Sequence, residues 1–421
     1  MLYERWRRVA REFEGEIALR DLGTNESWTF GQLAKITEKG DLPGGPVSFP
    51  SGMTVQFVFD ILKAWRTGQV VCPLEPGQRA PAIPSIPPGV THLKLTSATT
   101  GSHKLVAFTG AQLAADAEQI VETMGLRPDR PNLAVISLAH SYGFSNLVTP
   151  LLLHGIPLII SNSALPEAIR AASKSGTLAL PAVPALWRTW HEAGVLSLSS
   201  IDLAISAGAP LPVQLESSVF ETSGIKIHNF YGATECGGIA YDRSSEPRID
   251  GGCAGSPLHN VTLGVDSESR LEVRSAAVAE GYWPKRSPDL GKGLFRTSDI
   301  AEISEGLIYL RGRATDQINI AGRKVFPDTI ERFLLTHPGI RECVVFGVAS
   351  SELERVENIV ACVETDGSLT PAALREFALS RLPSWQVPRH WWLVSKIARN
   401  NRGKVSRAEL RAAYLRVSGS A

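Results

Sequence analysis

The chain has 421 residues, a formal net charge of +1 and 43% hydrophobic residues. A chain of this length exceeds one small core, so we expect two or more domains. The balanced charge provides neither a basic surface for nucleic acid nor an acidic tail. Five cysteines without a C-x-x-C pair favour a reducing compartment without a disulfide framework or structural metal, and we expect a cytoplasmic protein.

The first part of the chain begins with a charged amphipathic pattern. Residues 1–16 place large apolar side chains on one side of a helix, without the apolar core of a signal peptide. The most apolar stretch, residues 144–160, is interrupted by two prolines and a His-Gly pair. It therefore predicts buried core and no membrane span.

Short apolar runs and helical patterns then alternate. The strand-length runs lie at 133–138, 158–161, 178–180 and 203–206, and the helical patterns lie at 110–124, 165–173, 184–193 and 212–222. This alternation predicts layered α/β structure with buried, largely parallel strands. From about residue 250 the runs shorten and alternate between Gly, Pro and Ser, which predicts a small antiparallel, β-rich subdomain at 250–313.

The pattern changes again after residue 313. Helical patterns lie at 328–336, at 371–382 and from 406 onward, and strand-like runs lie at 343–348, 358–364 and 390–394. These elements form an α+β module of about a hundred residues, which is large enough to fold alone. We therefore expect a large domain at 1–313 and a small carboxyl-terminal domain at 314–421.

A loop rich in hydroxyl groups follows the apolar run at 93–95. Residues 96–104 read T-S-A-T-T-G-S-H-K. Hydroxyls, backbone N–H groups, a glycine and a lysine suit a polyanion such as phosphate. The sequence does not fit G-x-x-x-x-G-K-[ST], and Ser/Thr/Gly runs also form ordinary surface loops. The loop alone leaves both alternatives open.

Four later segments carry groups that a nucleotide site needs. They are N-F-Y-G-A-T-E at 229–235 after a strand-like run at 225–227, F-R-T-S-D at 295–299 with its acid at the end of a strand pattern, G-R at 312–313, and R-G-K at 402–404 before a helix. In this order, and with the loop at 96–104, the chain resembles the adenylate-forming superfamily of AMP-forming acyl-CoA synthetases, luciferases and peptide-synthetase adenylation domains. The segments at 206–211 and 316–327 also match the sequence pattern of this superfamily, so the resemblance covers essentially the whole chain.

The resemblance implies an ATP site. The residues that it assigns to ATP are Thr96, Ser97, Thr99, Thr100, Gly101 and Lys104 at the phosphates, Gly208, Ala209, Pro210, Asn229, Tyr231, Gly232 and Thr234 around the adenine, Asp299 at the ribose hydroxyls, and Arg313 at the ribose or phosphate. Glu235, together with Thr99, would hold Mg²⁺, a hard cation that prefers carboxylate and phosphate oxygens. Ordinary structural roles stay open for several of these residues: a core aromatic for Tyr231, an ion pair for Glu235 and a junction salt bridge for Arg313.

The resemblance also implies a catalytic lysine. Lys404 would span the acid carboxylate and the α-phosphate, where two negative charges meet in the transition state. By composition alone, a lysine beside glycine near a carboxyl terminus is usually just solvated. In this family the small domain rotates between two half-reactions, so Lys404 would approach for adenylation and withdraw for thioester formation.

The segment A-H-S-Y-G at 139–143 corresponds to the border of the acyl pocket. The implied pocket residues are His140, Ser141, Tyr142, Gly143, Ser206 and Gly232. His140 is also a catalytic candidate that would cover the carboxylate, or else an ordinary core histidine. No acidic residue lies between Asp129 and Glu167 to pair with a substrate ammonium, which disfavours an amino acid and favours an aryl or fatty acid.

The resemblance therefore implies an enzyme that converts a carboxylic acid and ATP into an acyl-adenylate and pyrophosphate. Transfer to the thiol of CoA, or to the phosphopantetheine of a carrier protein acting in trans, would follow. The chain departs from the family pattern at Ala98, His103, Ser298, Thr315 and Ala398, and its first subdomain is short. A non-catalytic nucleotide- or acyl-binding homologue is the alternative, but the charged groups of the family site are all retained.

Overall fold

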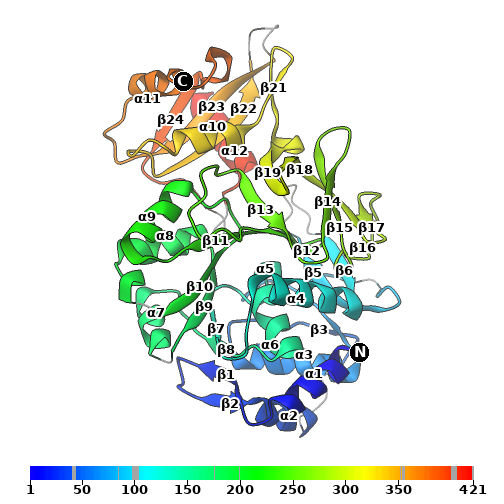
Figure 1. The fold of residues 1–421 in the computed structure, drawn as a ribbon. Coiled ribbons are helices and arrows are strands. Elements are labelled where there is room, and N and C mark those ends of the chain that lie inside the picture. Colours follow the sequence, from blue (N-terminus) through cyan, green and yellow to red (C-terminus); the bar gives the residue numbers. More distant parts are fainter. Residues whose placement is uncertain are drawn as a thin grey trace.

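The computed structural model describes residues 1–39, 44–83, 85–96, 104–174, 176–198, 200–350, 352, 356–399 and 405–419. The ribbon has a large body that contains the amino terminus and a smaller body at the carboxyl-terminal end (Figure 1). Sheets with helices packed beside them make up both bodies, which confirms the predicted α/β fold class with a small α+β carboxyl-terminal part.

One 14-stranded sheet runs through the large body. Its order is β14 (Thr262–Val265), β15 (Arg270–Arg274), β18 (Leu294–Ser304), β19 (Leu307–Arg313), β13 (Cys253–Pro257), β12 (Gly237–Tyr241), β11 (Ile227–Ala233), β10 (Ile201–Ser206), β9 (Leu178–Ala182), β7 (Asn132–Ala134), β8 (Leu158–Ile160), β1 (Ile17–Asp21) and β2 (Ser27–Thr29), with β17 (Leu290–Gly291) paired to β18. The strands from β1 to β11 pair in parallel, and those from β11 to β14 pair antiparallel. The predicted parallel and antiparallel regions are therefore joined in one sheet.

Helices pack around this sheet. They are α1 (Leu2–Glu12), α2 (Phe30–Lys39), α3 (Val55–Thr67), α4 (Gly110–Met124), α5 (Ser141–Gly143), a π-helix (Phe144–Val148), α6 (Thr149–His154), α7 (Pro166–Ser173), α8 (Pro184–Glu192) and α9 (Val213–Ser223). Helix α4 shows why such bounds can be predicted. Thr109 and Gln112 form a capping box at its start, and Gly125 ends it in the left-handed conformation.

A second sheet carries the hydroxyl-rich loop. Its order is β16 (Gly281–Trp283), β6 (Leu105–Thr109), β5 (Val90–Leu95), β4 (Val70–Val71) and β3 (Val47–Ser48). Strands β5 and β6 are antiparallel neighbours, and the loop connects them. Both ends of the loop are therefore anchored in one sheet.

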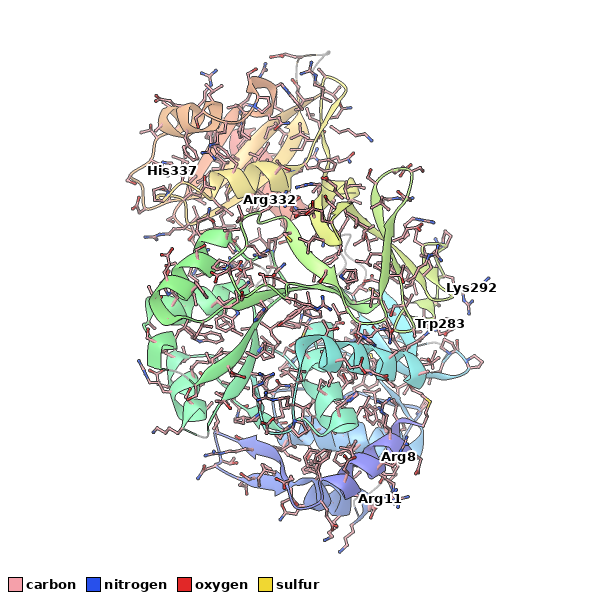
Figure 2. All side chains as sticks on the ribbon, in the orientation of Figure 1. Arg8, Arg11, Trp283, Lys292, Arg332 and His337 are labelled. Carbon is pink, nitrogen blue, oxygen red and sulfur yellow. The ribbon has the colours of Figure 1, made fainter. Side chains whose placement is uncertain are left out.

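The small body follows β19. It contains a 3₁₀ turn (Ala314–Asp316), a hairpin of β20 (Ile318–Ile320) and β21 (Arg323–Val325), the sheet β22 (Glu342–Ala349), β23 (Glu357–Glu364) and β24 (His390–Val394), and the helices α10 (Pro327–Leu334), α11 (Pro371–Leu379) and α12 (Arg407–Ser418). Figure 2 shows Arg332 of α10 at the junction, where its Nη1 donates to the Leu310 carbonyl at 3.0 Å. Arg188 Nη1 of α8 donates to the Arg341 carbonyl at 2.8 Å. The domain boundary at 313/314 stays a prediction, and it coincides with the end of β19.

Three predicted strand patterns differ from the structure. The run at 133–138 forms a strand only as far as Ala134, because the chain then turns, and Ser137 donates to Glu75 at 2.7 Å and accepts from the Ala139 N–H. Residues 229–233, expected to follow a strand, lie inside β11, which pairs with β12. Asp299, expected at a strand end, lies within the long strand β18.

The apolar stretch at 144–160 forms core. Residues Phe144 to Leu153 are buried against α4, α1 and the sheet. Among the described residues, no helix has both the length and the apolar character that crossing a bilayer requires.

His154, at the end of α6, makes stability depend on pH. Burial, and next the charge of Arg5, lowers the pKa of His154 to about 4. Below pH 6.5, the ordinary pKa of histidine, His154 is protonated in the unfolded chain but stays neutral in the folded protein. The free energy of unfolding therefore decreases as the pH falls from 6.5 towards 4. Between pH 7.5 and pH 5.0 we expect the free energy of unfolding to fall by about 1 kcal/mol more in the wild type than in His154→Gln, allowing for solvent screening of a partly exposed ring. Denaturant unfolding of both proteins at the two pH values measures this, and equal losses would contradict it.

Candidate functional site

The hydroxyl-rich loop is closed at its base by a backbone hydrogen bond. The Thr96 N–H donates to the Lys104 carbonyl at 2.9 Å. Lys104 is exposed and Thr96 is half-buried. The other predicted phosphate residues, Ser97, Thr99, Thr100 and Gly101, and the departures Ala98 and His103, lie outside the described residues. Lys404 lies outside them as well.

Tyr282 of β16 connects the end of this loop with Glu235. Strand β16 pairs with β6, which begins directly after Lys104. The Lys104 Nζ lies 5.0 Å from the centre of the Tyr282 ring. The Tyr282 hydroxyl donates to Glu235 Oε1 at 2.8 Å. The predicted metal ligand therefore lies next to the predicted phosphate loop, although many residues separate them in the sequence.

The surroundings of Glu235 fit a divalent cation. Burial raises the pKa of the Glu235 carboxyl, and the Tyr282 hydrogen bond opposes the rise. Within the described part of the chain no Lys, Arg or His forms an ion pair with Glu235, so the structural ion pair weighed as an alternative does not occur there. A partly buried carboxylate without a cation suits a hard ion such as Mg²⁺. The same residues contain no group of three His, Cys, Asp or Glu side chains that could hold a metal, so phosphate oxygens would have to complete the coordination.

Asp299 is held by two side chains. Its Oδ2 accepts a short hydrogen bond from the Tyr231 hydroxyl, and its Oδ1 pairs with Arg313 Nε at 3.0 Å. Asp299 and Arg313 lie opposite each other in the β18–β19 pairing. Burial, and next the neighbouring Asp299, raises the pKa of Tyr231 well above its ordinary value. The junction salt bridge weighed for Arg313 is therefore present, and it fixes the acid predicted to bind ribose.

The predicted adenine residues surround the ends of β10 and β11. Ser206, which was predicted for the acyl pocket, ends β10 fully buried, and its hydroxyl has no hydrogen-bond partner among the described residues. Gly208 follows with a φ of +84°, a conformation that favours glycine. Ala209 and Pro210 are exposed next to it, while Asn229, Gly232 and Thr234 lie on or just after β11. The carboxyl ends of neighbouring parallel strands are where α/β sheets commonly bind ligands.

In the predicted acyl segment, His140 directly precedes α5, and Ser141, Tyr142 and Gly143 form this short helix. Gly143 packs so tightly that a Cβ there would lie 2.0 Å from the Ser137 carbonyl oxygen. The Tyr142 hydroxyl lies 3.4 Å from the Ala182 and Ile205 carbonyl oxygens. Tyr142 thus bonds the backbone of β9 and β10, whereas His140 and Ser141 border a cavity.

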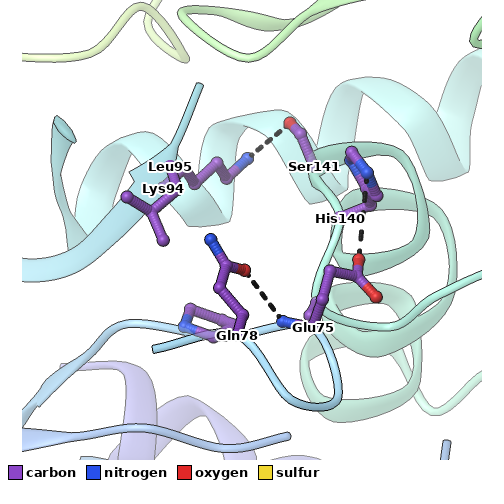
Figure 3. A pocket seen from close by; sticks show the side chains of 8 residues that line it. Glu75, Gln78, Lys94, Leu95, His140 and Ser141 are labelled. Carbon is purple, nitrogen blue, oxygen red and sulfur yellow. Dashed lines mark hydrogen bonds and ion pairs between the residues drawn. The ribbon is translucent and has the colours of Figure 1, made fainter. Parts of the chain in front are cut away.

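This cavity is polar. It is lined by Pro73, Glu75, Gln78, Lys94, Leu95, Ala139, His140 and Ser141 (Figure 3). His140 Nε2 lies 3.8 Å from Glu75 Oε1, and Lys94 Nζ donates to Ser141 Oγ at 3.3 Å. Tyr142, Gly143, Ser206 and Gly232 do not line it, so the predicted pocket residues are not all brought together in this cavity.

Two residues near the candidate site, Tyr282 and Lys94, were not predicted from the sequence. Tyr282 has a visible signal, the aromatic pair at 282–283, but its pairing with β6 is long-range. Lys94 lies between two leucines in the strand V-T-H-L-K-L, and this charge between apolar neighbours could have been noticed. The ends of β10 and β11, together with Asp299 and Glu235, lie where the sequence predicts a nucleotide site, and the polar cavity begins at Lys94 and Leu95, just before the predicted phosphate loop.

Comparison with known proteins identifies the family. The AMP-binding enzyme family matches residues 90–283, and the AMP-binding enzyme C-terminal domain matches residues 329–404. A relative from Mycobacterium tuberculosis, named a probable 2-succinylbenzoate–CoA ligase, is 32% identical over 331 residues, covering 75% of this chain and 82% of the relative. The chain therefore belongs to the AMP-binding enzyme family of adenylate-forming ligases, which confirms the resemblance seen in the sequence.

Other relatives differ in the acid that their names give. A long-chain-fatty-acid–CoA ligase from Escherichia coli is 28% identical over 349 residues, which is 77% of this chain and 62% of that protein. ATP-bound MatB from Rhodopseudomonas palustris has the same fold, with a TM-score of 0.86 at 20% identity over 99% of this chain and 100% of that one. Family membership thus leaves the acid open.

Proposed function

We propose that this protein activates a carboxylic acid with ATP, forming an acyl-adenylate and pyrophosphate, and then transfers the acyl group to the thiol of CoA. One observation supports the proposal: Glu235 lies close enough to Asp299 and Arg313 for their charges to act on it, and it also lies beside the end of the predicted phosphate loop. The pKa of Glu235 responds, after burial and its hydrogen bonds, to the charges of Arg313 and Asp299. Tyr282 connects the same glutamate to Lys104.

In the first half-reaction, a carboxylate oxygen of the acid attacks the α-phosphorus and the bond to pyrophosphate breaks. Asp299 would accept hydrogen bonds from the ribose hydroxyls, with Tyr231 and Arg313 orienting its carboxylate. Glu235, together with Thr99, would hold Mg²⁺, which supplies positive charge to the phosphates when bound. Lys404 would stabilise the charge that builds up as the carboxylate meets the phosphate.

In the second half-reaction, the thiol sulfur attacks the acyl carbonyl, the bond to AMP breaks and the thiol proton is released. His140 lies at the edge of the polar cavity, where it can cover the acyl group. A rotation of the small body would break the hydrogen bonds of Arg332 and Arg188 across the junction. CoA is the favoured acceptor because the relatives are named as CoA ligases; a carrier protein in trans is the alternative.

The test measures pyrophosphate release from ATP with a panel of aryl, fatty and dicarboxylic acids. Each acid is tested with CoA and with a phosphopantetheinylated carrier protein, and mass spectrometry identifies the thioester. We expect pyrophosphate and AMP in equal amounts, and an acyl-CoA product from at least one acid. Thioester only on the carrier would favour the carrier alternative. ATP binding without pyrophosphate from any acid would overturn the proposal in favour of a binding homologue.

A further inference from the structure

Lys94 places a buried positive charge on the wall of the polar cavity. It lies on β5, and only 4% of the residue is exposed. Its Nζ is 3.3 Å from both Ser141 Oγ and Ser145 Oγ, and it lies 4.8 Å from the centre of the Phe108 ring. Figure 3 shows the ammonium group facing Ser141, across the cavity from Gln78 and Glu75.

This ammonium has no carboxylate in direct contact among the described residues. Burial lowers the pKa of Lys94, and the nearby charge of Asp116 opposes that fall. The closest acidic contact is indirect: Ser145 donates to Asp116 Oδ2 at 2.5 Å, while Asp116 Oδ1 accepts from the Gly238 N–H at 3.0 Å. An ammonium has three N–H donors, and two hydrogen bonds go to the hydroxyls of Ser141 and Ser145. A buried charge with no carboxylate in direct contact is costly, so an anionic acceptor in the adjoining cavity would stabilise this ammonium.

The other charged groups of the cavity are already partnered. Glu75 accepts from the Ser137 hydroxyl at 2.7 Å and lies near His140. The Glu75 N–H donates to Gln78 Oε1 at 3.1 Å. Among the described residues that line the cavity, Lys94 is therefore the cation that has no carboxylate in contact. A long alkyl chain placed here would bury Lys94 and Glu75 without water, which disfavours a fatty acid.

The position of Lys94 suits a short ligand. Lys94 and Thr96 are two residues apart on one extended segment, so their Cα atoms are about 7 Å apart. Thr96 begins the predicted phosphate loop, next to which the reacting carboxylate must lie. An acid that reaches from the α-phosphate to Lys94 would therefore have a compact body, such as a short chain or a single ring.

From this geometry we infer that the cavity receives the second carboxylate of a short dicarboxylic acid, and that Lys94 is the residue that selects it. The inference rests on the proposed acid activation and narrows its substrate. Lys94 acts on specificity by pairing with a group remote from the reacting carboxylate. The bond-making steps are those of the proposed function and do not change.

The experiment compares each dicarboxylic acid with its monomethyl ester, which keeps the same carbon skeleton but replaces the second charge by a methyl ester. For wild-type enzyme we expect kcat/KM in pyrophosphate release to be about 100-fold higher for the diacid, because the ester leaves Lys94 buried and unpaired. Lys94→Met keeps the length of the side chain and removes its charge. It should lower kcat/KM for the diacid by about 100-fold while changing that of the ester by less than about threefold. Lys35→Met, at an exposed lysine on α2, is the matched control and should change neither.

The outcomes separate this inference from the proposed function. Equal use of diacid and ester by the wild type, or an equal loss of both in Lys94→Met, would overturn the role of Lys94 and leave acid activation intact. If no acid released pyrophosphate, the proposed function would fail, and calorimetric binding of the diacid to wild type and Lys94→Met would then decide the inference alone. If Lys94→Met did not fold, the diacid-to-ester ratio of the wild type and of Lys94→Gln would decide it.

Discussion

Replacing Lys404 by alanine is expected to lower the rate of acyl-adenylate formation at least about 100-fold, the usual effect of removing one group that stabilises transition-state charge. ATP binding should persist, because the ribose and metal ligands stay in place. The measurement is isotope exchange between pyrophosphate and ATP in the presence of the acid, with ATP binding followed by calorimetry. Thioester formation from a separately prepared acyl-adenylate should be much less affected, because in the proposed mechanism Lys404 acts only in the first half-reaction.

The control is Lys396→Ala, which removes an exposed lysine from the segment after β24. It should leave pyrophosphate exchange unchanged. Exchange at the wild-type rate in Lys404→Ala would show that the lysine has no part in the chemistry. Loss of ATP binding together with exchange would instead indicate a ground-state role in holding the nucleotide.

Local signals explain why much of the fold could be predicted. The helix predicted at 110–124 matches α4, because its capping box and carboxyl-terminal glycine are local features. The strand predicted at 390–394 matches β24 for a similar reason, a compact run of β-forming residues. The order of the motifs identified the family, which no single motif would have done, and the nucleotide-site residues that follow from it stay a prediction.

Long-range pairing explains what could not be predicted. The segment at 229–233 contains Asn and Gly, which favour a turn, but its antiparallel partner β12 continues it as a strand. Tyr282 meets Glu235 only because β16 adds to the edge of the second sheet. Lys94 lies between two leucines in β5, and only the fold brings Ser141, Ser145 and the cavity around it.

Replacing Asp299 by asparagine is expected to lower kcat/KM for ATP about 100-fold, mainly through a higher KM. Hydrogen bonds to a charged acceptor contribute about 1.5–3 kcal/mol each, and Asp299 would make them to ribose in both the ground state and the transition state. The amide would also place a donor opposite Tyr231 or Arg313, both of which donate to the carboxylate. Steady-state kinetics with varied ATP measures the change.

Glu302→Gln is a matched control because Glu302 lies on the same strand and pairs with Arg311 of β19 at 2.7 Å, as Asp299 pairs with Arg313. This exposed pair should contribute about 0–1 kcal/mol to stability and nothing to ATP use. Tyr231→Phe then separates the two roles of the tyrosine, since it keeps the ring for adenine and removes the hydroxyl that orients Asp299. A higher KM for ATP in Tyr231→Phe would show that the hydroxyl contributes by orienting Asp299. Unchanged kinetics would show that only the ring of Tyr231 contributes. Unchanged KM in Asp299→Asn would remove Asp299 from the ribose site altogether.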